Sequence, residues 1–211
     1  MRDSADVDRW SRPNRPRGVI AGVVLAGGAG TRFGEHVKQL APLAGRPLLE
    51  HALAAASVAP LHRVIVVLGA HADRISEQVD LHGAEPVICE RWREGMAASL
   101  RVGLNAVPDA EAVVILLGDQ PLITAAAIER VLAARDRAVP AVRATYGGHP
   151  GHPVLLEREL FPRLLQLGGD AGARNVLDEV AVREVACDDV ADPTDIDTPE
   201  DLRALEARQA H

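Results

Sequence analysis

From residue 18 onward, short runs of β-branched and other apolar residues alternate with longer stretches rich in alanine and leucine. Each run is long enough for one strand, and the chain between two runs is long enough for one amphipathic helix, which is typical of βαβ units around a parallel sheet. The nearly continuous apolar character of the runs indicates strands that helices cover on both faces. The pattern predicts an α/β protein with three α/β/α layers and a mostly parallel, Rossmann-like sheet.

The apolar runs and their flanking residues set the expected boundaries. Strands are predicted over Val19–Leu25, Arg63–Leu68, Ala84–Ile88, Ala112–Leu117, Ala141–Tyr146 and Val182–Ala186. Helices are predicted near Pro47–Ser57, Ala72–Val79, Gly95–Ala106, Thr124–Asp136, Glu157–Gln166 and Ala171–Glu179. A closing helix is predicted from Thr198 to about Arg208, because a capping hydroxyl is followed by proline and then by an acid at the third helical position, Asp201.

The length of 211 residues predicts one domain, since a chain of this size can bury a single core. Residues 1–17 hold five arginines, three aspartates and two prolines without apolar periodicity, so we expect a disordered arm there and the folded domain over 18–211. A net charge of -7 and an aromatic content of 2% argue against a nucleic-acid partner.

The location of the protein is predicted from what the sequence lacks. No apolar run approaches the roughly 20 residues that cross a bilayer, and the N-terminus does not have the order of a secretory signal. Cys89 and Cys187 are too far apart in sequence for a CxxC motif, so both are expected to be reduced. We expect a cytoplasmic protein, a monomer or a homodimer, with no membrane partner.

A glycine-rich loop, Ala26-Gly27-Gly28-Ala29-Gly30, follows the first predicted strand. Glycines permit positive φ angles and let backbone N–H groups approach an anion, so the loop predicts a phosphate or nucleotide cradle. A Walker loop is excluded because no GxxxxGK string is present. A dinucleotide fingerprint is weakly supported, since the third glycine of GxGxxG arrives one position late, at Gly34.

Charged residues near this loop and after a later strand suggest the rest of the site. Arg32 and Lys38 follow the loop where a triphosphate would lie. Asp119 follows the strand Ala112–Leu117, at the sheet edge where the loop is also expected. Asp197, with Asp195 as the second choice, precedes the closing helix. Two carboxylates are a donor set that suits Mg²⁺, which takes its remaining ligands from water and phosphates.

With these residues in place, the chain resembles the MobA-like nucleotidyltransferases, in particular the branch of molybdenum cofactor cytidylyltransferases. The resemblance covers roughly residues 18–205. The motifs that carry it are Leu25–Gly28 with Arg32 and Lys38, Arg46–His51, Trp92–Met96, Gly118–Pro121, Gly151–Val154, Gly169–Arg174 and Asp195–Leu202.

The resemblance implies a role for each candidate residue. It implies that Arg32, Lys38 and Asp119 are catalytic residues and that Asp119 and Asp197 bind the metal. The implied nucleotide-binding residues are Leu25, Ala26, Gly27, Gly28, Gly30, Arg32, Lys38 and Gly118. The implied acceptor-binding residues are Trp92, Ser99, His152, Asp170 and Arg174. Arg174 also lies where a predicted helix begins, a place that favours anions, whereas His149 and His152 are expected to be turn residues rather than zinc ligands.

The reaction implied is transfer of CMP or GMP, with Mg²⁺, from a nucleoside triphosphate to a phosphorylated acceptor, molybdopterin, with release of pyrophosphate and with a molybdoenzyme as partner. The base stays open, because cytidylyl members usually carry Ala-Ala-Gly where this chain has Ala26-Gly27-Gly28. Two other functions stay open as well. One is an NAD(P)H-dependent oxidoreductase, since relatives include proteins named nicotine blue oxidoreductases; the other is an accessory module that binds a nucleotide or cofactor without turnover.

Overall fold

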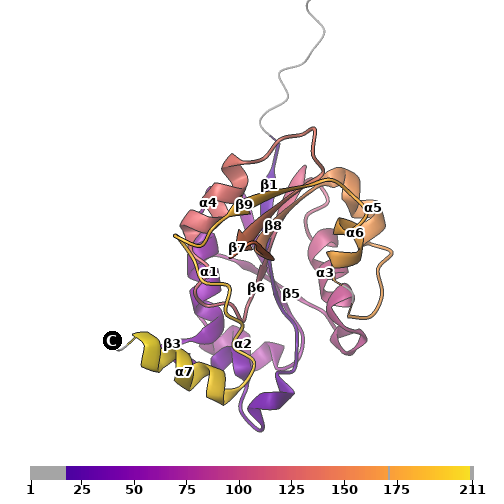
Figure 1. Ribbon diagram of the computed structural model, residues 1–211. Helices are drawn as coiled ribbons and strands as arrows, with labels where there is room; N and C mark the ends of the chain where they lie inside the picture. Colours follow the sequence, from indigo (N-terminus) through magenta and orange to yellow (C-terminus); the bar gives the residue numbers. More distant parts are fainter. Residues whose placement is uncertain (1–17, 171, 210–211) are drawn as a thin grey trace, which may run out of the picture.

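Seven strands form the middle layer of the molecule, in a computed structural model that describes residues 18–170 and 172–209 (Figure 1). In order across the sheet they are β5 (Glu85–Ile88), β4 (Arg63–Leu68), β1 (Ile20–Ala26), β6 (Ala112–Leu117), β8 (His149–Glu157), β7 (Ala141–Tyr146) and β9 (Val182–Ala186). Every neighbouring pair is parallel except the two pairs that β8 makes with β6 and β7. The prediction of a mostly parallel sheet is confirmed.

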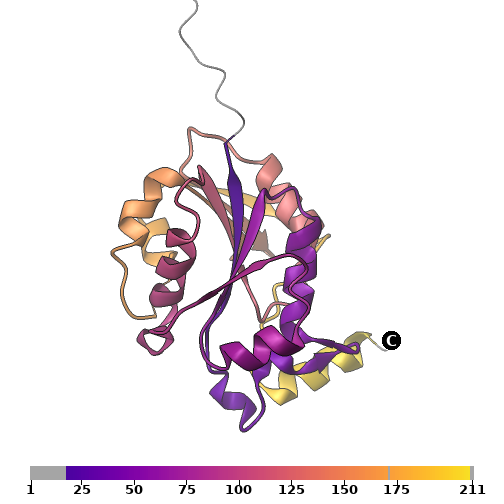
Figure 2. The same cartoon turned by 180° about the vertical axis from the view of Figure 1, so that it is seen from behind.

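Helices cover both faces of this sheet (Figures 1 and 2). One face packs against α1 (Leu48–Val58), α2 (Ala72–Gln78) and α4 (Ala125–Ala133), and the other against α3 (Met96–Asn105), α5 (Phe161–Leu164) and α6 (Arg174–Leu177). Val23 and Val24 are adjacent in β1, and both are fully buried, Val24 in the first core and Val23 in the second. Because successive strand residues point to opposite faces, a strand covered twice must be apolar throughout. The three-layer prediction is therefore also confirmed.

A third, smaller core lies below the main sheet. It joins the two-stranded sheet of β2 (Pro42–Leu43) and β3 (Arg46–Pro47) to the closing helix α7 (Pro199–Gln209). Its buried members are Phe33, Ala41, Leu43, Leu48, Ile196, Leu202 and Leu205. Ile196 is fully buried, so this core holds the segment just before α7 against the rest of the molecule.

The antiparallel strand β8 was not predicted. It follows β7 through a two-residue turn, in which Gly147 has a φ of 56° and Gly148 a φ of 76°. Two left-handed glycines between strands are typical of a hairpin turn. The prolines at positions 150 and 153 favour a loop in the sequence, yet the strand accommodates them with a register shift between Arg143 and Thr145.

Two helix predictions near the C-terminal half were also wrong in extent. Residues predicted as one helix over 157–166 instead end β8 at Glu157, form a 3₁₀ turn over Arg158–Leu160 and then the short α5. The helix predicted over 171–179 is reduced to α6, with residue 171 outside the described part. The predicted disordered arm, residues 1–17, also lies outside the described residues.

The strand order places the expected site. β1 lies between β4 and β6 in the sheet. The helix that leads into β4 and the helix that leads into β6 pack on opposite faces of the sheet, so the strand order reverses its direction beside β1. Ligands of such sheets bind beyond the carboxyl ends of the strands at this point. Leu25 at the end of β1 pairs with Leu117 at the end of β6, so the loops that follow both strands share one edge. In the described residues, no helix is both long and apolar enough to cross a membrane.

Candidate functional site

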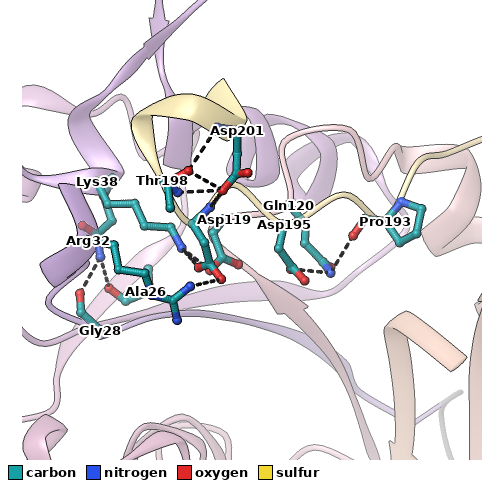
Figure 3. Close-up of polar contacts among 12 residues, drawn as sticks. Ala26, Gly28, Arg32, Lys38, Asp119, Gln120, Pro193, Asp195, Thr198 and Asp201 are labelled. Carbon is teal, nitrogen blue, oxygen red and sulfur yellow. Dashed lines mark hydrogen bonds and ion pairs between the residues drawn. The ribbon is translucent and has the colours of Figure 1, made fainter. Parts of the chain in front are cut away.

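The glycine-rich loop after β1 is fixed by a side chain that the sequence did not suggest. The amide nitrogen of Gln39, Nε2, donates hydrogen bonds to the carbonyl oxygens of Ala26 at 3.0 Å and Gly28 at 2.8 Å (Figure 3). Gln39 is only 6% exposed. Because two loop carbonyls bond inward to Gln39, the loop is held in one conformation around its backbone N–H groups. Only its position directly after Lys38 could have pointed to Gln39.

Gly30 is required by the same loop. Its φ of 60° lies in the left-handed region, where a 3₁₀ turn over Thr31–Phe33 begins. A Cβ at this position would also lie 2.6 Å from the Cβ of Lys38, which is closer than van der Waals contact permits. Glycine at position 30 thus lets Lys38 pack against the loop.

Lys38 is the only lysine of the chain, all other basic residues besides histidine being arginine. Its Nζ lies 2.7 Å from Asp119 Oδ2 and 2.8 Å from Asp197 Oδ1, between the two acids (Figure 3). The side chain is 9% exposed. Burial lowers the pKa of Lys38, but the charge of Asp119 and the hydrogen bonds to both carboxylates outweigh it, so the pKa is raised and the ammonium stays charged.

Asp197 is positioned by the start of α7. The hydroxyl of Thr198 accepts a hydrogen bond from the backbone N–H of Asp201 at 3.1 Å. The Asp201 carboxylate in turn accepts from the backbone N–H groups of Asp197 at 3.1 Å and Thr198 at 2.8 Å. This reciprocal capping box, which the sequence predicts, fixes the backbone of Asp197 at the helix N-terminus.

Arg32 completes the charged group from the solvent side. Its guanidinium donates to Asp197 Oδ2 at 2.8 Å, and its side chain is 67% exposed. The hydrogen bond from Lys38, together with the charges of Lys38 and Arg32, holds the pKa of Asp197 below its ordinary value. Two cations and two carboxylates that are far apart in sequence thus meet at the edge where β1 and β6 end.

Asp119 and Asp197 also meet through the backbone. Asp119 follows β6, and its carbonyl oxygen accepts a hydrogen bond of 3.0 Å from the backbone N–H of Ile196. Since Ile196 is fully buried in the third core, this hydrogen bond connects the loop after β6 to a packed segment at the start of α7. The two candidate metal ligands therefore have a fixed separation set by the fold.

The chemistry of this pair suits a magnesium ion. Lys38 takes one oxygen of Asp119, and the described residues donate no hydrogen bond to its Oδ1. No three His, Cys, Asp or Glu side chains gather as a metal cluster within residues 18–170 and 172–209. Among the described residues, Asp197 accepts from Lys38 and Arg32 at its two oxygens. A pair of carboxylates is a donor set that suits a metal such as Mg²⁺, which takes its other ligands from water and phosphate.

A cavity of about 410 Å³ opens over this charged group. Of the predicted residues, its walls include Leu25, Ala26, Gly27, Gly28, Gly30, Arg32, Lys38, Trp92, Ser99, Gly118, Asp119, Asp170 and Asp197. The predicted nucleotide-binding, catalytic and metal-binding residues thus all face one cavity. Trp92 and Ser99, which the resemblance places beside the acceptor, line this cavity too.

A second cavity of about 630 Å³ shares walls with the first. Leu25, Met96, Leu117 and Asp170 line both cavities. His152 and Arg174, the other two predicted acceptor residues, line only the second. Burial lowers the pKa of His152 to about 4, so its imidazole is neutral at pH 7. His152 therefore offers an anion a hydrogen bond but no positive charge.

Two polar residues of the second cavity were missed from the sequence. Gln120 is 4% exposed, and its Nε2 donates to Asp195 Oδ1 at 2.9 Å and to the carbonyl of Pro193 at 3.2 Å (Figure 3). Burial and the charge of Asp119 raise the pKa of Asp195. Arg143, on β7, donates to Glu184 at 2.8 Å and adds a cation to this cavity. Arg143 belongs to none of the sequence motifs, so only the fold indicates that it lines this cavity.

The sequence between residues 22 and 185 matches the family model described as the MobA-like NTP transferase domain. A nicotine blue oxidoreductase of Paenarthrobacter nicotinovorans is 32% identical over 195 residues, which are 88% of this chain and 96% of that protein.

Solved structures are similar to this chain over most of its length. The crystal structure of Rv0371c from Mycobacterium tuberculosis H37Rv superposes with a TM-score of 0.81 at 35% identity, over 90% of this chain and 98% of that one. A complex of Rv0371c with manganese gives a TM-score of 0.78 at 33% identity, over 90% and 98% of the two chains.

Proposed function

Because the chain belongs to the MobA-like NTP transferase family, we propose that it transfers the nucleotidyl group of CTP or GTP to a phosphorylated acceptor and releases pyrophosphate. The observation that carries this proposal is the position of Lys38 between Asp119 and Asp197, below a glycine-rich loop in one cavity. Cations for phosphates, carboxylates for a metal and a backbone cradle are the parts that phosphoryl chemistry needs.

In the proposed complex the triphosphate lies on the loop after β1. The backbone N–H groups of Gly27 and Gly28 face its oxygens, and Arg32 and Lys38 supply positive charge. Arg32 is exposed and bonded to one carboxylate only, so it can turn toward a phosphate at small cost. Lys38 is buried, and it keeps its charge in place without reorganisation during the reaction.

Asp119 and Asp197 would hold the divalent metal. When bound, Mg²⁺ neutralises phosphate charge and makes the α-phosphorus more electrophilic. The manganese complex of Rv0371c supports a divalent metal in this family. The capping box of α7 keeps Asp197 oriented for this role, and the backbone bond from Ile196 keeps Asp119 beside it.

The second cavity is the proposed acceptor site, because it adjoins the first through shared walls. Arg143 and Arg174 are its cations, and Gln120 and His152 supply neutral polar groups. An oxygen of the acceptor phosphate forms a bond to the α-phosphorus while the bond from that phosphorus to the β-bridging oxygen breaks. Pyrophosphate leaves with the bridging oxygen. Molybdopterin is the acceptor that the family resemblance supports, and a molybdoenzyme the partner.

Release of pyrophosphate tests this proposal. With CTP or GTP, Mg²⁺ and molybdopterin, the wild-type protein should release pyrophosphate, and Asp119→Asn should reduce the rate about 100-fold or more, since one charged ligand is lost. Asp109→Asn is the matched control, because Asp109 is exposed and lies before β6, away from both cavities. Full activity of Asp119→Asn would refute the proposed role.

A second function is supported by one comparison, the similarity to a nicotine blue oxidoreductase over almost the whole of both chains. In that case the chain would reduce a quinoid acceptor with NAD(P)H. The glycine spacing of the loop after β1 departs from a dinucleotide fingerprint, which favours the transferase. Saturable binding of NADPH, together with no affinity for any nucleoside triphosphate, would reverse this order.

A further inference from the structure

Two residues that line the second cavity each keep a buried polar atom without a hydrogen-bond partner. In the described part of the chain these atoms are Gln120 Oε1 and Arg143 Nε. Neither residue lines the first cavity. Native proteins pair almost all of their buried polar atoms, because an unpaired one has lost its hydrogen bonds to water. A molecule that fills the second cavity can supply both missing partners.

The orientation of the Gln120 amide follows from its neighbours. Its Nε2 donates to Asp195 Oδ1 at 2.9 Å and to the carbonyl oxygen of Pro193 at 3.2 Å (Figure 3). A rotation of the amide by half a turn would place Oε1 against these two acceptors, which is unfavourable. Gln120, which is 4% exposed, therefore keeps a hydrogen-bond acceptor unused.

Arg143 keeps a hydrogen-bond donor unused. Its Nη2 donates to Glu184 Oε1 at 2.8 Å, so a carboxylate already balances the charge of the guanidinium. The Nε–H group in the same plane has no partner among the described residues. The side chain is 17% exposed, so Arg143 is not a free surface cation. The buried group that it has left for a ligand is one N–H donor.

The wall that connects these two residues is apolar. Arg143 of β7 pairs with Val154 of β8, and Val154 pairs with Ile115 of β6. Side chains of paired residues stand on the same face of a sheet, so the three form one row along the cavity. Leu117 continues this face along β6, toward Gln120. The second cavity thus combines an apolar floor with a donor from β7 and an acceptor from the loop after β6.

This combination suits the flat ring of a heterocycle. The faces of such a ring are apolar enough to lie on the floor, and its edge can carry an N–H group beside a carbonyl oxygen. A fully ionised phosphate or carboxylate can accept from Arg143, but it has no hydrogen to donate to Gln120. The two unpaired atoms therefore favour an uncharged ring edge over an anion.

We propose that Gln120 and Arg143 are specificity-determining residues for the ring of the acceptor. Gln120 Oε1 accepts from a ring N–H group, and Arg143 Nε donates to the neighbouring carbonyl oxygen. This assignment rests on the proposed nucleotidyltransferase function and deepens it, since it places the choice of acceptor at the ring as well as at the phosphate.

Two rings that carry no phosphate test this pair. Pterin, the ring of the acceptor proposed above, has an N–H group beside a carbonyl oxygen. In 2,4-diaminopteridine a bare ring nitrogen lies beside an amino group, so the pattern of donor and acceptor is inverted. Titration calorimetry with the full chain, CTP and Mg²⁺ measures binding of each ring. The wild type should bind pterin at least about tenfold more tightly, because the inverted edge leaves both buried atoms unpaired.

Variants of both residues should lose part of this preference. Gln120→Met removes the acceptor and should lower the preference for pterin roughly three- to tenfold. Arg143→Lys keeps a positive charge beside Glu184 but has no Nε–H group, and it should lower the preference by a similar factor. If Arg143 served only as a cation for the phosphate, lysine would leave the choice between two uncharged rings unchanged.

Matched variants outside both cavities serve as controls. Arg183→Lys changes an arginine of the neighbouring strand β9 that also donates to a carboxylate. Gln78→Met changes an exposed glutamine at the end of α2. Both should keep the wild-type preference for pterin. If Gln120→Met does not fold, because it also loses the hydrogen bonds of Nε2, the comparison of Arg143→Lys with Arg183→Lys still decides.

The outcomes separate this pair from the proposed function. If the wild type binds neither CTP nor GTP with Mg²⁺, the proposed function fails. If it binds one of them but binds the two rings equally, or binds neither ring, the role of Gln120 and Arg143 is refuted while the function stands. A wild-type preference for pterin that survives unchanged in both variants would refute that role as well.

Discussion

Lys38 organises the site at the scale of single residues. Its compact ammonium lies within 2.8 Å of oxygens from two carboxylates, and the side chain of Lys38 is only 9% exposed to solvent. A guanidinium is planar and larger, so it cannot bridge the same two oxygens as a point charge. In a chain whose other basic side chains, histidine aside, are all arginine, this requirement gives a physical reason for a lysine at position 38.

We therefore predict that Lys38→Arg does not substitute for lysine. Lys38→Met should weaken binding of the magnesium nucleotide about 10- to 100-fold, because a charged hydrogen-bond donor is lost beside two carboxylates. Lys38→Arg should recover only a small part of this loss. Titration calorimetry measures both. Binding by Lys38→Arg at the wild-type level would contradict the argument from size and shape.

Residues with charge were predictable from the sequence, and residues that hold the charges in place were not. Arg32, Lys38, Asp119 and Asp197 follow strands or precede a helix, so their meeting follows from the topology of a parallel sheet. Gln39 acts through loop carbonyls that no sequence pattern marks. Its role depends on three-dimensional contacts alone.

At the scale of elements, the N-terminus of α7 connects helix formation to the site. The Thr198 hydroxyl accepts a hydrogen bond from the backbone N–H of Asp201. The Asp201 carboxylate accepts hydrogen bonds from the backbone N–H groups of Thr198 and Asp197, so Asp197 is itself part of this capping box. A helix cap normally affects only stability. Here the same hydrogen bonds also orient a candidate metal ligand, so cap and ligand are coupled.

Removal of this cap should affect stability and binding together. Thr198→Ala should lower the free energy of unfolding by about 1 kcal/mol and should also weaken binding of the magnesium nucleotide. Thr198→Ser keeps the hydroxyl and is the matched control. Urea unfolding and calorimetry give the two readouts. A Thr198→Ala protein that loses stability but binds like Thr198→Ser would show that the cap does not position Asp197.

The β7–β8 hairpin was not predicted from the sequence. Substitutions in its turn test why glycine is needed there. A Cβ on Gly147 or Gly148 would meet no atom within 4 Å, so alanine at either position acts only through the left-handed backbone. Gly147→Ala should lower the free energy of unfolding by about 1–2 kcal/mol. Gly147→Asn should cost less, since asparagine tolerates this conformation. Equal losses for Ala and Asn in thermal melts would contradict this explanation.

The hairpin also explains why part of the second cavity was unpredictable. Gly147-Gly148 between two apolar segments is a hairpin signal in the sequence, but the prolines that follow favour a loop. Without β8, Arg143 and His152 have no defined relation to β6. The parallel strands were predictable because each has its own apolar run, whereas the apolar run of β8 is limited to residues 154–156 and is preceded by two prolines.

At the scale of the whole molecule, one sheet edge brings together segments that span most of the chain. The loop after β1, the loop after β6 and the start of α7 meet at the first cavity, and residues of α3, α6, β7 and β8 line the second. Two adjoining cavities with shared walls suit a reaction between two substrates, since their reacting atoms are held close together. In the proposed function, the first of these cavities binds a magnesium nucleotide.

A thermal-shift screen with CTP, GTP, ATP, UTP and NADPH, each with and without Mg²⁺, tests whether this cavity binds a magnesium nucleotide. A ligand that binds the native state raises its apparent stability by about 2.7 kcal/mol at a concentration 100 times its Kd, which for a chain of this size is a shift of about 5–10 °C. We predict such a shift for CTP or GTP only when Mg²⁺ is present, and none for NADPH. A shift with NADPH, together with none for any nucleoside triphosphate, would contradict it.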